Sequence, residues 1–188
     1  MTASQREPAK QLRPVHPPFT HFPIAAYVLA AAFDIISLAG GSGHKWSAQL
    51  WHAGTFVLVA GLGVCLLTML TGFWDLIRFP DHTQEAIRAI AVHVCVQAAV
   101  FMIGVGDVAW RLSERNQAST PPGILVLTVS AAVLVCVGGH IGGTLVFKYG
   151  TGVAGSALAE TPEQAAAPSE PAPSHGHAPA PRHRSQAS

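Results

Sequence analysis

The sequence predicts an all-α fold, a bundle of four transmembrane helices with a disordered C-terminal tail. Charged residues make up only 11% of the 188-residue chain, against about 25% in soluble domains, which is too few to cover a soluble surface. The mean hydropathy is +0.36, and the apolar residues fall into four blocks, each near the roughly 17 to 25 residues that a helix needs to cross a bilayer. The four spans are expected at about 22–40, 51–75, 86–110 and 122–147.

The first span is the shortest, and it contains an acidic residue, Asp34. A buried helix of a soluble protein is the alternative, but four such apolar runs would leave a soluble bundle without a polar face. Pro17, Pro18 and Pro23 fix the path of the chain into this helix, since proline is tolerated in a first helical turn. No basic segment with a short apolar core and a small-residue cleavage site is visible before the span, so we expect an uncleaved anchor.

Lysine and arginine residues are divided unevenly between the two sides of the predicted membrane. One side holds six of them near the spans and the other side holds three, and the richer side normally lies in the cytoplasm. The sequence therefore predicts a multi-pass membrane protein, with residues 1–20 and both termini in the cytoplasm. The first group is Arg6, Lys10, Arg13, Arg78, Arg88 and Lys148, and the second is Lys45, Arg111 and Arg115.

The helical domain is expected to cover residues 21–150, because the composition changes beyond Gly150. Residues 151–188 are rich in Ala, Pro and His and contain hardly any bulky apolar side chain. Such a segment buries too little surface to offset the entropy lost on folding, so a disordered tail is predicted. Its three histidines could bind metal weakly, but solvent-exposed residues without a structured role are the simpler interpretation.

Small and polar residues recur at helical spacing in the second and third spans. Lipid-facing positions need no polarity, so these repeats mark the faces that are turned into the bundle. In the second span the small residues form a seam that lets a neighbouring helix approach closely, and in the third span three polar side chains share one stripe. The seam comprises Gly54, Leu58, Gly61, Cys65, Thr68, Gly72 and Asp75, and the stripe comprises His93, Gln97, Val100, Gly104 and Asp107.

The fourth span carries one histidine, His140, between two pairs of glycines. The glycines thin the helix there, which permits either close helix contact or the approach of a flat ligand. Counted from the cytoplasmic ends of their spans, His93 and His140 both lie about 10 Å into the bilayer at the helical rise. His16, His21 and Asp75 lie on the same side, so the sequence predicts a histidine-rich inner layer. The opposite, outer layer contains Asp34, His52 and Asp107.

Ionisable residues inside a membrane are candidates for a functional site, and three interpretations stay open. In the first, His93 and His140 are axial ligands of a b-type haem that carries electrons, with His16 or His21 close to a propionate. In the second, these four histidines and Asp75 bind a transition metal and, together with the outer acids, move metal or protons. In the third, the histidines only specify helix packing.

The remaining observations narrow the class of function. A formal net charge of +1 provides no basic field for nucleic acid. No nucleophile, oxyanion or phosphate-binding signature is visible, so we expect no catalytic activity of the chain's own. The favoured interpretation is a small haem-binding or electron-transfer component of the membrane, surrounded by lipid and served by a redox partner protein.

Four short motifs, one for each span in order, carry a family resemblance. They are HPPFTHFPI at 16–24, TGFWD at 71–75, AVH at 91–93 and HIGGTLVFKYGTGV at 140–153. Together they resemble the bacterial predicted membrane proteins grouped as domain of unknown function 2231, over about residues 15 to 153.

The resemblance implies a four-helix inner-membrane protein without an assigned activity. Some relatives are joined to redox domains of the Rieske or cytochrome type, which by analogy favours electron transfer. Many relatives have a histidine where this chain has Tyr149, so we expect no functional histidine at the cytoplasmic end of the fourth span in this chain.

Overall fold

The computed structural model describes residues 14–80 and 82–151, and it confirms the four-helix architecture. Within those residues there is no strand, and all four α-helices are long and apolar enough to cross a membrane. Each predicted span lies within one helix. The predicted tail lies outside the described residues except for its first position, Thr151. The elements are the 3-10 turn η1 (Pro17–Phe19) and the helices α1 (His21–Gly40), α2 (Lys45–Arg78), α3 (Gln84–Ser113) and α4 (Pro122–Phe147).

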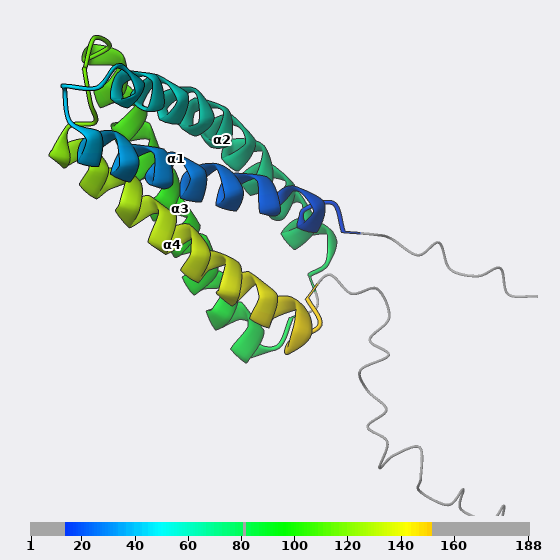
Figure 1. Ribbon diagram of the computed structural model, residues 1–188. Coiled ribbons are helices and arrows are strands. Elements are labelled where there is room, and N and C mark those ends of the chain that lie inside the picture. The colour runs from blue at the N-terminus through cyan, green and yellow to red at the C-terminus, as the bar shows by residue number, and fades with distance from the viewer. Residues whose placement is uncertain (1–13, 81, 152–188) are drawn as a thin grey trace, which may run out of the picture. The chain divides into compact units, whose positions relative to one another are not determined.

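The helices run alternately in opposite directions, so the two ends of the described chain lie at the same end of the bundle (Figure 1). Helix α1 packs mainly against α2 and also against α4, while α3 packs mainly against α4; α2 and α3 share the smallest contact. We call the end with residues 14–20, the last turns of α2 and α4 and the first turns of α3 the histidine end. The other end, with the α1–α2 and α3–α4 connections, is the arginine end.

The predicted small-residue seam of α2 is buried, as expected. Five of its seven residues are buried, Gly72 and Asp75 are half-buried, and Ala26 of α1 sits directly on Gly61. Close backbone approach of this kind is how helices pack where lipid removes the hydrophobic difference between inside and outside. The buried residues of α2 are Ser47, Trp51, Gly54, Leu58, Gly61, Cys65 and Thr68.

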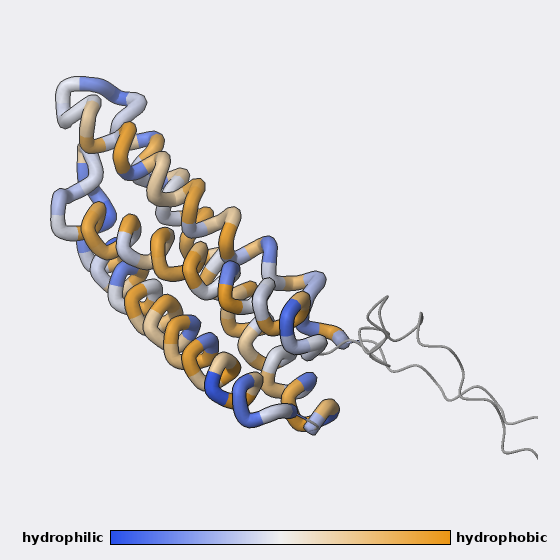
Figure 2. The backbone as a smooth tube through the Cα atoms, turned by 90° about the horizontal axis from the view of Figure 1, so that it is seen from below, coloured by the Kyte–Doolittle hydropathy of each residue, from blue (hydrophilic) through white to orange (hydrophobic). Residues whose placement is uncertain are grey.

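Large apolar side chains lie on the outside of the bundle, as a lipid-facing surface requires. Phe56 is 75% exposed and Phe147 is 84% exposed. Figure 2 shows hydrophobic residues along the helices, whereas hydrophilic residues concentrate towards the helix ends and connections. The outside of the bundle is therefore suited to lipid, and the informative polar residues are those that turn inwards.

Local sequence explains where the helices begin and end. The hydroxyl of Thr83 caps α3 by accepting a hydrogen bond from the Ala86 N–H, at 3.2 Å, and this satisfies a donor that has no partner within the helix. Helix α1 ends at Gly41, whose φ of 62° favours glycine. Helices α2 and α3 extend beyond the predicted apolar spans, and Ser47 and Arg111 in their additional turns are buried at the arginine end.

Candidate metal site and buried ion-pair network

At the histidine end, Asp75 near the end of α2 anchors the chain that leads into α1. Its Oδ2 accepts hydrogen bonds from the backbone N–H groups of Val15 and His16, both at 2.8 Å. The imidazole of His16 then reaches the backbone of α2, with its Nδ1 2.8 Å from the carbonyl oxygen of Thr68. A Cβ at Gly72 would come within 3.0 Å of that Nδ1, so the absence of a side chain there makes room for the ring.

His93 makes the corresponding contact between α3 and α4. Its Nδ1 lies 3.0 Å from the carbonyl oxygen of Gly138, and its Cε1 would be 3.2 Å from a Cβ at Gly142. Gln97, one turn further along the stripe of α3, lies over Gly138. Of the two possibilities that the glycines permitted, these positions therefore serve close helix contact, because they accommodate polar side chains of α3.

The hydrogen bonds fix the tautomers of both rings. A carbonyl oxygen can only accept, so the Nδ1 atoms of His16 and His93 must donate, and in the neutral ring Nε2 is then left with a lone pair. No hydrogen bond reaches either Nε2 from the residues that the structure describes. The two ring centres are 6.5 Å apart, with their planes at 86°. Metal-binding histidines typically show this arrangement, in which one ring nitrogen donates to the protein and the other is available.

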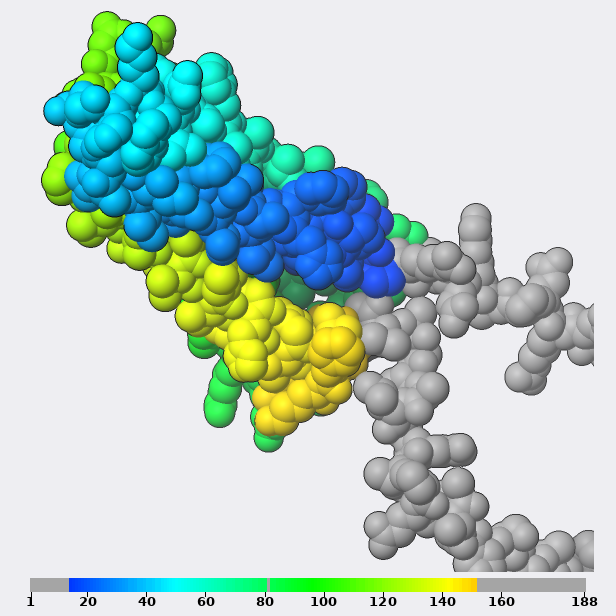
Figure 3. Space-filling view, viewed as in Figure 1, coloured from blue at the N-terminus to red at the C-terminus, as the bar shows by residue number. Residues whose placement is uncertain are grey.

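Asp75 contributes a third unpartnered acceptor at this end. Its second oxygen, Oδ1, is buried and has no hydrogen-bond partner among the described residues. The space-filling view shows a small gap at this end between the start of α1 and the end of α4 (Figure 3). Nevertheless, the described residues contain no group of three or more His, Cys, Asp or Glu side chains arranged to hold a metal ion. Any metal here would therefore have two protein ligands unless Asp75 moved.

The other two candidate ligands, His21 and His140, lie apart from this pair. His21 is exposed at the first residue of α1, and His140 is exposed on α4. Because His140 is two residues from both Gly138 and Gly142, the helical rotation of about 100° per residue turns it away from the face that contacts His93. It lies instead beside a shallow surface hollow. That hollow is lined by His140, Gly143, Thr144, Phe147 and Lys148.

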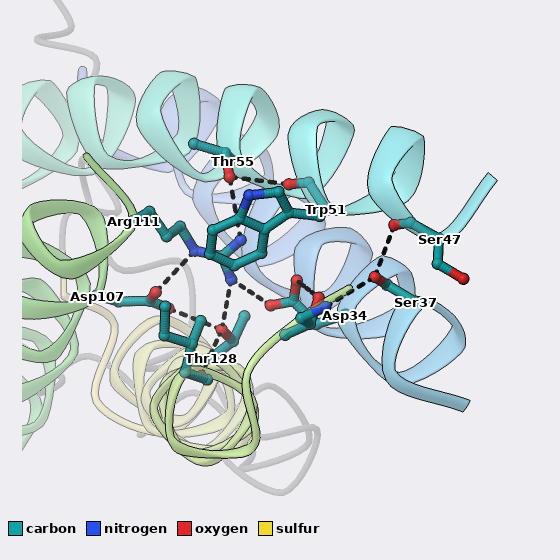
Figure 4. Close-up of polar contacts among 10 residues, drawn as sticks. Asp34, Ser37, Ser47, Trp51, Thr55, Asp107, Arg111 and Thr128 are labelled. Carbon is teal, nitrogen blue, oxygen red and sulfur yellow. Dashed lines mark hydrogen bonds and ion pairs between the residues drawn. The ribbon is translucent and has the colours of Figure 1, made fainter. Parts of the chain in front are cut away.

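The arginine end contains a buried network centred on a residue that the sequence analysis placed in a connection, Arg111. Its NH2 group pairs with Oδ2 of Asp34 on α1, and its Nε donates to Oδ1 of Asp107, one turn earlier on α3, at 2.7 Å (Figure 4). All three side chains are at most 1% exposed. The two acids of the predicted outer layer are therefore brought together, and an arginine joins them.

Neutral side chains complete the network. The guanidinium group of Arg111 lies 4.7 Å from the ring centre of Trp51, a favourable cation–π contact, and donates at 2.9 Å to the hydroxyl of Thr128 on α4. Thr120 in the α3–α4 connection donates to Asp34 at 3.1 Å. Residues from all four helices are thus held together by one cation (Figure 4).

Sequence reasoning missed the role of Arg111, although the signal was present. Arg111 continues the stripe of α3 by a step of four from Asp107, and an acid followed four residues later by arginine is a favourable helical pair. Counting it as an exposed connection residue ignored that spacing. His52, by contrast, is exposed and takes no part in the network.

Four long apolar helices, with two clusters of inward-facing polar groups, define an integral membrane bundle, the class of protein to which this chain belongs. A family model described as "Predicted membrane protein (DUF2231)" matches residues 12–155. The chain therefore belongs to this family, as its motifs indicated. No curated protein and no solved structure matches it.

Proposed function

We propose that the protein binds a transition-metal centre through Nε2 of His16 and Nε2 of His93, and that this centre gives it an electron-transfer role in the membrane. The observation that carries the proposal is the pair of matched tautomers. Both Nδ1 atoms are held by backbone carbonyl groups on different helices, so both rings are oriented before any ligand arrives. Such orientation by a second hydrogen bond raises the basicity of a histidine ligand.

The separation of the rings leaves room for one metal between them, provided that both Nε2 atoms turn towards it. Two collinear metal–nitrogen bonds of about 2.0–2.1 Å, with about 1.1 Å more from each nitrogen to its ring centre, place the centres about 6.3 Å apart. The observed value is 6.5 Å, whereas ligands at a tetrahedral angle would be about 5 Å apart. A b-type haem is the first occupant to test: His16 and His93 would hold its iron, and the haem would supply single-electron exchange. In this proposal His16 takes the place that the sequence hypothesis gave to His140.

A single metal ion is the second candidate, and a specific observation favours it. The buried Oδ1 of Asp75 has no hydrogen-bond partner within residues 14–80 and 82–151, and its carboxylate already touches the backbone of His16. A small rotation or ordered water could add an oxygen ligand to the two imidazoles, a donor set that suits several first-row metals. The protein would then bind or carry a metal ion.

The cytoplasmic side is the proposed location of the histidine end. Since Arg111 is buried and paired with acids, it no longer counts as a free positive charge of the other side. The bias then rises from six against three to six against two, which strengthens the assignment of this end to the cytoplasm under the positive-inside rule. We therefore propose a location in a bacterial inner membrane, with a redox partner on the cytoplasmic side.

The test is to purify the full chain in detergent through an affinity tag without histidine, after expression with added haem precursor, and to record its absorption spectrum and metal content. The informative variants are His16→Asn and His93→Asn. Asparagine can still donate from the position of Nδ1 to the backbone carbonyl, but it removes Nε2. Matched controls are His21→Asn and His140→Asn, which change exposed histidines.

A Soret band lost in both ligand variants and kept in both controls would support the haem centre. Stoichiometric metal without a Soret band, lost in the same two variants, would support the single ion. Loss of the spectrum in His140→Asn but not in His16→Asn would instead support the His93 and His140 pair predicted by the sequence. Colourless, metal-free protein that folds normally would overturn the proposal and leave helix packing as the role of the histidines.

A further inference from the structure

The Arg111 network contains one more carboxyl group than it has cations. Asp34 and Asp107 both contact Arg111, while the other partners, Thr55, Thr120 and Thr128, are neutral. If both carboxyl groups were ionised, the network would have a net charge of −1 in a site where its charged side chains are at most 1% exposed. Burying an uncompensated charge inside a membrane is strongly unfavourable.

A count of hydrogens at Thr128 identifies the place where a neutralising proton fits. Its Oγ1 lies 2.7 Å from Oδ2 of Asp107 and 3.0 Å from the carbonyl oxygen of Ile124, and it also accepts a hydrogen bond from Arg111 at 2.9 Å. The hydroxyl group has one hydrogen, so it can donate fully to only one of the two oxygens. When it donates to Ile124, the short contact with Asp107 lacks a hydrogen.

Asp34 shows no such deficit. Its Oδ2 accepts from Arg111 and its Oδ1 accepts from the hydroxyl of Thr120 at 3.1 Å, so both oxygens face donors, as an ionised carboxylate requires. At Asp107, only Oδ1 faces a donor whose hydrogen is not shared with a second acceptor, namely the Nε of Arg111.

We propose that the network binds one proton and that Oδ2 of Asp107 carries it. The carboxyl O–H then donates to Oγ1 of Thr128, the Thr128 hydroxyl donates to Ile124, and the charges of Arg111 and Asp34 cancel. The ligand of this second site is a proton, and the site lies at the opposite end of the bundle from the histidines, so it does not depend on the proposed metal centre.

The surroundings of Asp107 contain no competing charge among the described residues of the network. Helix α1 contributes Asp34, α2 contributes only the neutral Trp51 and Thr55, and α4 contributes Thr128 (Figure 4). A further titratable group near Asp107 is the hydroxyl of Tyr27, which is buried without a hydrogen-bond partner among the described residues. It packs against Gly104, one turn from Asp107.

Infrared spectroscopy of the full chain tests this directly, in a detergent without ester groups and at neutral pH. A protonated carboxyl group has a C=O stretch above the amide bands, and the band shifts when the proton is exchanged for deuterium. We expect one such band in the wild type and its loss in Asp107→Asn, since asparagine imitates the protonated group in shape. Glu114→Gln, which changes a surface acid at the same end, should keep the band.

A second variant makes the test independent of the folding of Asp107→Asn. Thr128→Val removes the acceptor of the proposed O–H hydrogen bond, so the band should remain but move to higher wavenumber. The absence of a protonated-carboxyl band from the wild type, its persistence in Asp107→Asn, or an unshifted band in Thr128→Val would each overturn the proposal.

Discussion

The two ends of the bundle both contain inward-facing polar groups, but they differ in how completely these groups are satisfied. At the arginine end, Asp34, Asp107 and Arg111 are buried and every one of them has a charged partner. At the histidine end, His16 and His93 are only half-buried, and each ring has one nitrogen without a partner among the described residues. A closed network holds helices together, whereas an open set of acceptors is what a bound cation needs.

Helix packing accounts for the difference. The arginine end draws on all four helices and on the α3–α4 connection, which contributes Thr120. The histidine end joins helices in two separate pairs, since His16 bridges the chain before α1 to α2 while His93 bridges α3 to α4. Among the α-helices that contact each other, α2 and α3 share the least, and no ion pair between described residues links the two pairs at this end.

The largest expected effect is that of Arg111→Ala. Removing the guanidinium leaves two carboxyl groups buried without a cation, and breaking a buried pair in this way costs about 3–5 kcal/mol. Thermal unfolding in detergent should show a large fall in midpoint temperature. Arg115→Ala, at an exposed position of the same end, is the matched control and should stay within about 0.5 kcal/mol of the wild type.

Asp75→Ala measures how strongly the histidine end is held. It removes two hydrogen bonds from backbone N–H groups to a charged acceptor, bonds that contribute about 1.5–3 kcal/mol each when one partner is charged. We expect a total loss below that of Arg111→Ala, because water or lipid headgroups can reach the freed N–H of the exposed Val15. An equal or larger loss would contradict the view that this end is the more open one.

Two neighbouring glycines of α4 offer a smaller, sharper comparison. A methyl group at Gly142 would press on the His93 ring from 3.2 Å, whereas nothing lies within 4 Å of a Cβ at Gly143. Gly142→Ala should therefore cost about 1–3 kcal/mol through overpacking and weaken metal binding. Gly143→Ala should leave metal binding unchanged and should leave stability unchanged or slightly higher, because alanine has a higher helix propensity than glycine. Thermal unfolding and metal content, measured for both variants, test this difference between the two glycines.

The smallest effect is expected from Tyr27→Phe. The hydroxyl is buried and has no hydrogen-bond partner in the part of the chain that the structure describes, so its removal loses no hydrogen bond and relieves the cost of keeping a polar group from water. The midpoint of thermal unfolding should stay the same or rise, with a gain of up to about 1 kcal/mol. A clear loss of stability would show that the hydroxyl has a partner, such as a bound water linking it towards Asp107.

The sequence predicted more of the fold than of the site. The four apolar runs and the seam of α2 predicted which helices form and which face of α2 is buried, because lipid imposes simple limits on length and polarity. The stripe of α3 was predicted correctly as far as Asp107. The role of Arg111 was missed because positive charges near a span were counted by their place in the chain and not by helical rotation. For the histidines, equal depth in the membrane suggested His93 and His140, but depth does not specify direction around a helix.

The sequence by itself determined that this chain spans a membrane four times, to which family it belongs, and that its few ionisable residues form two layers. Only the tertiary structure decided which members of each layer meet. Contacts between helices depend on the rotation of each helix about its axis and on where the connecting segments lie, and neither is fixed by spacing within one helix. For that reason His16, from the segment before α1, lies beside His93, while His140 faces away, and one arginine joins two acids from different helices.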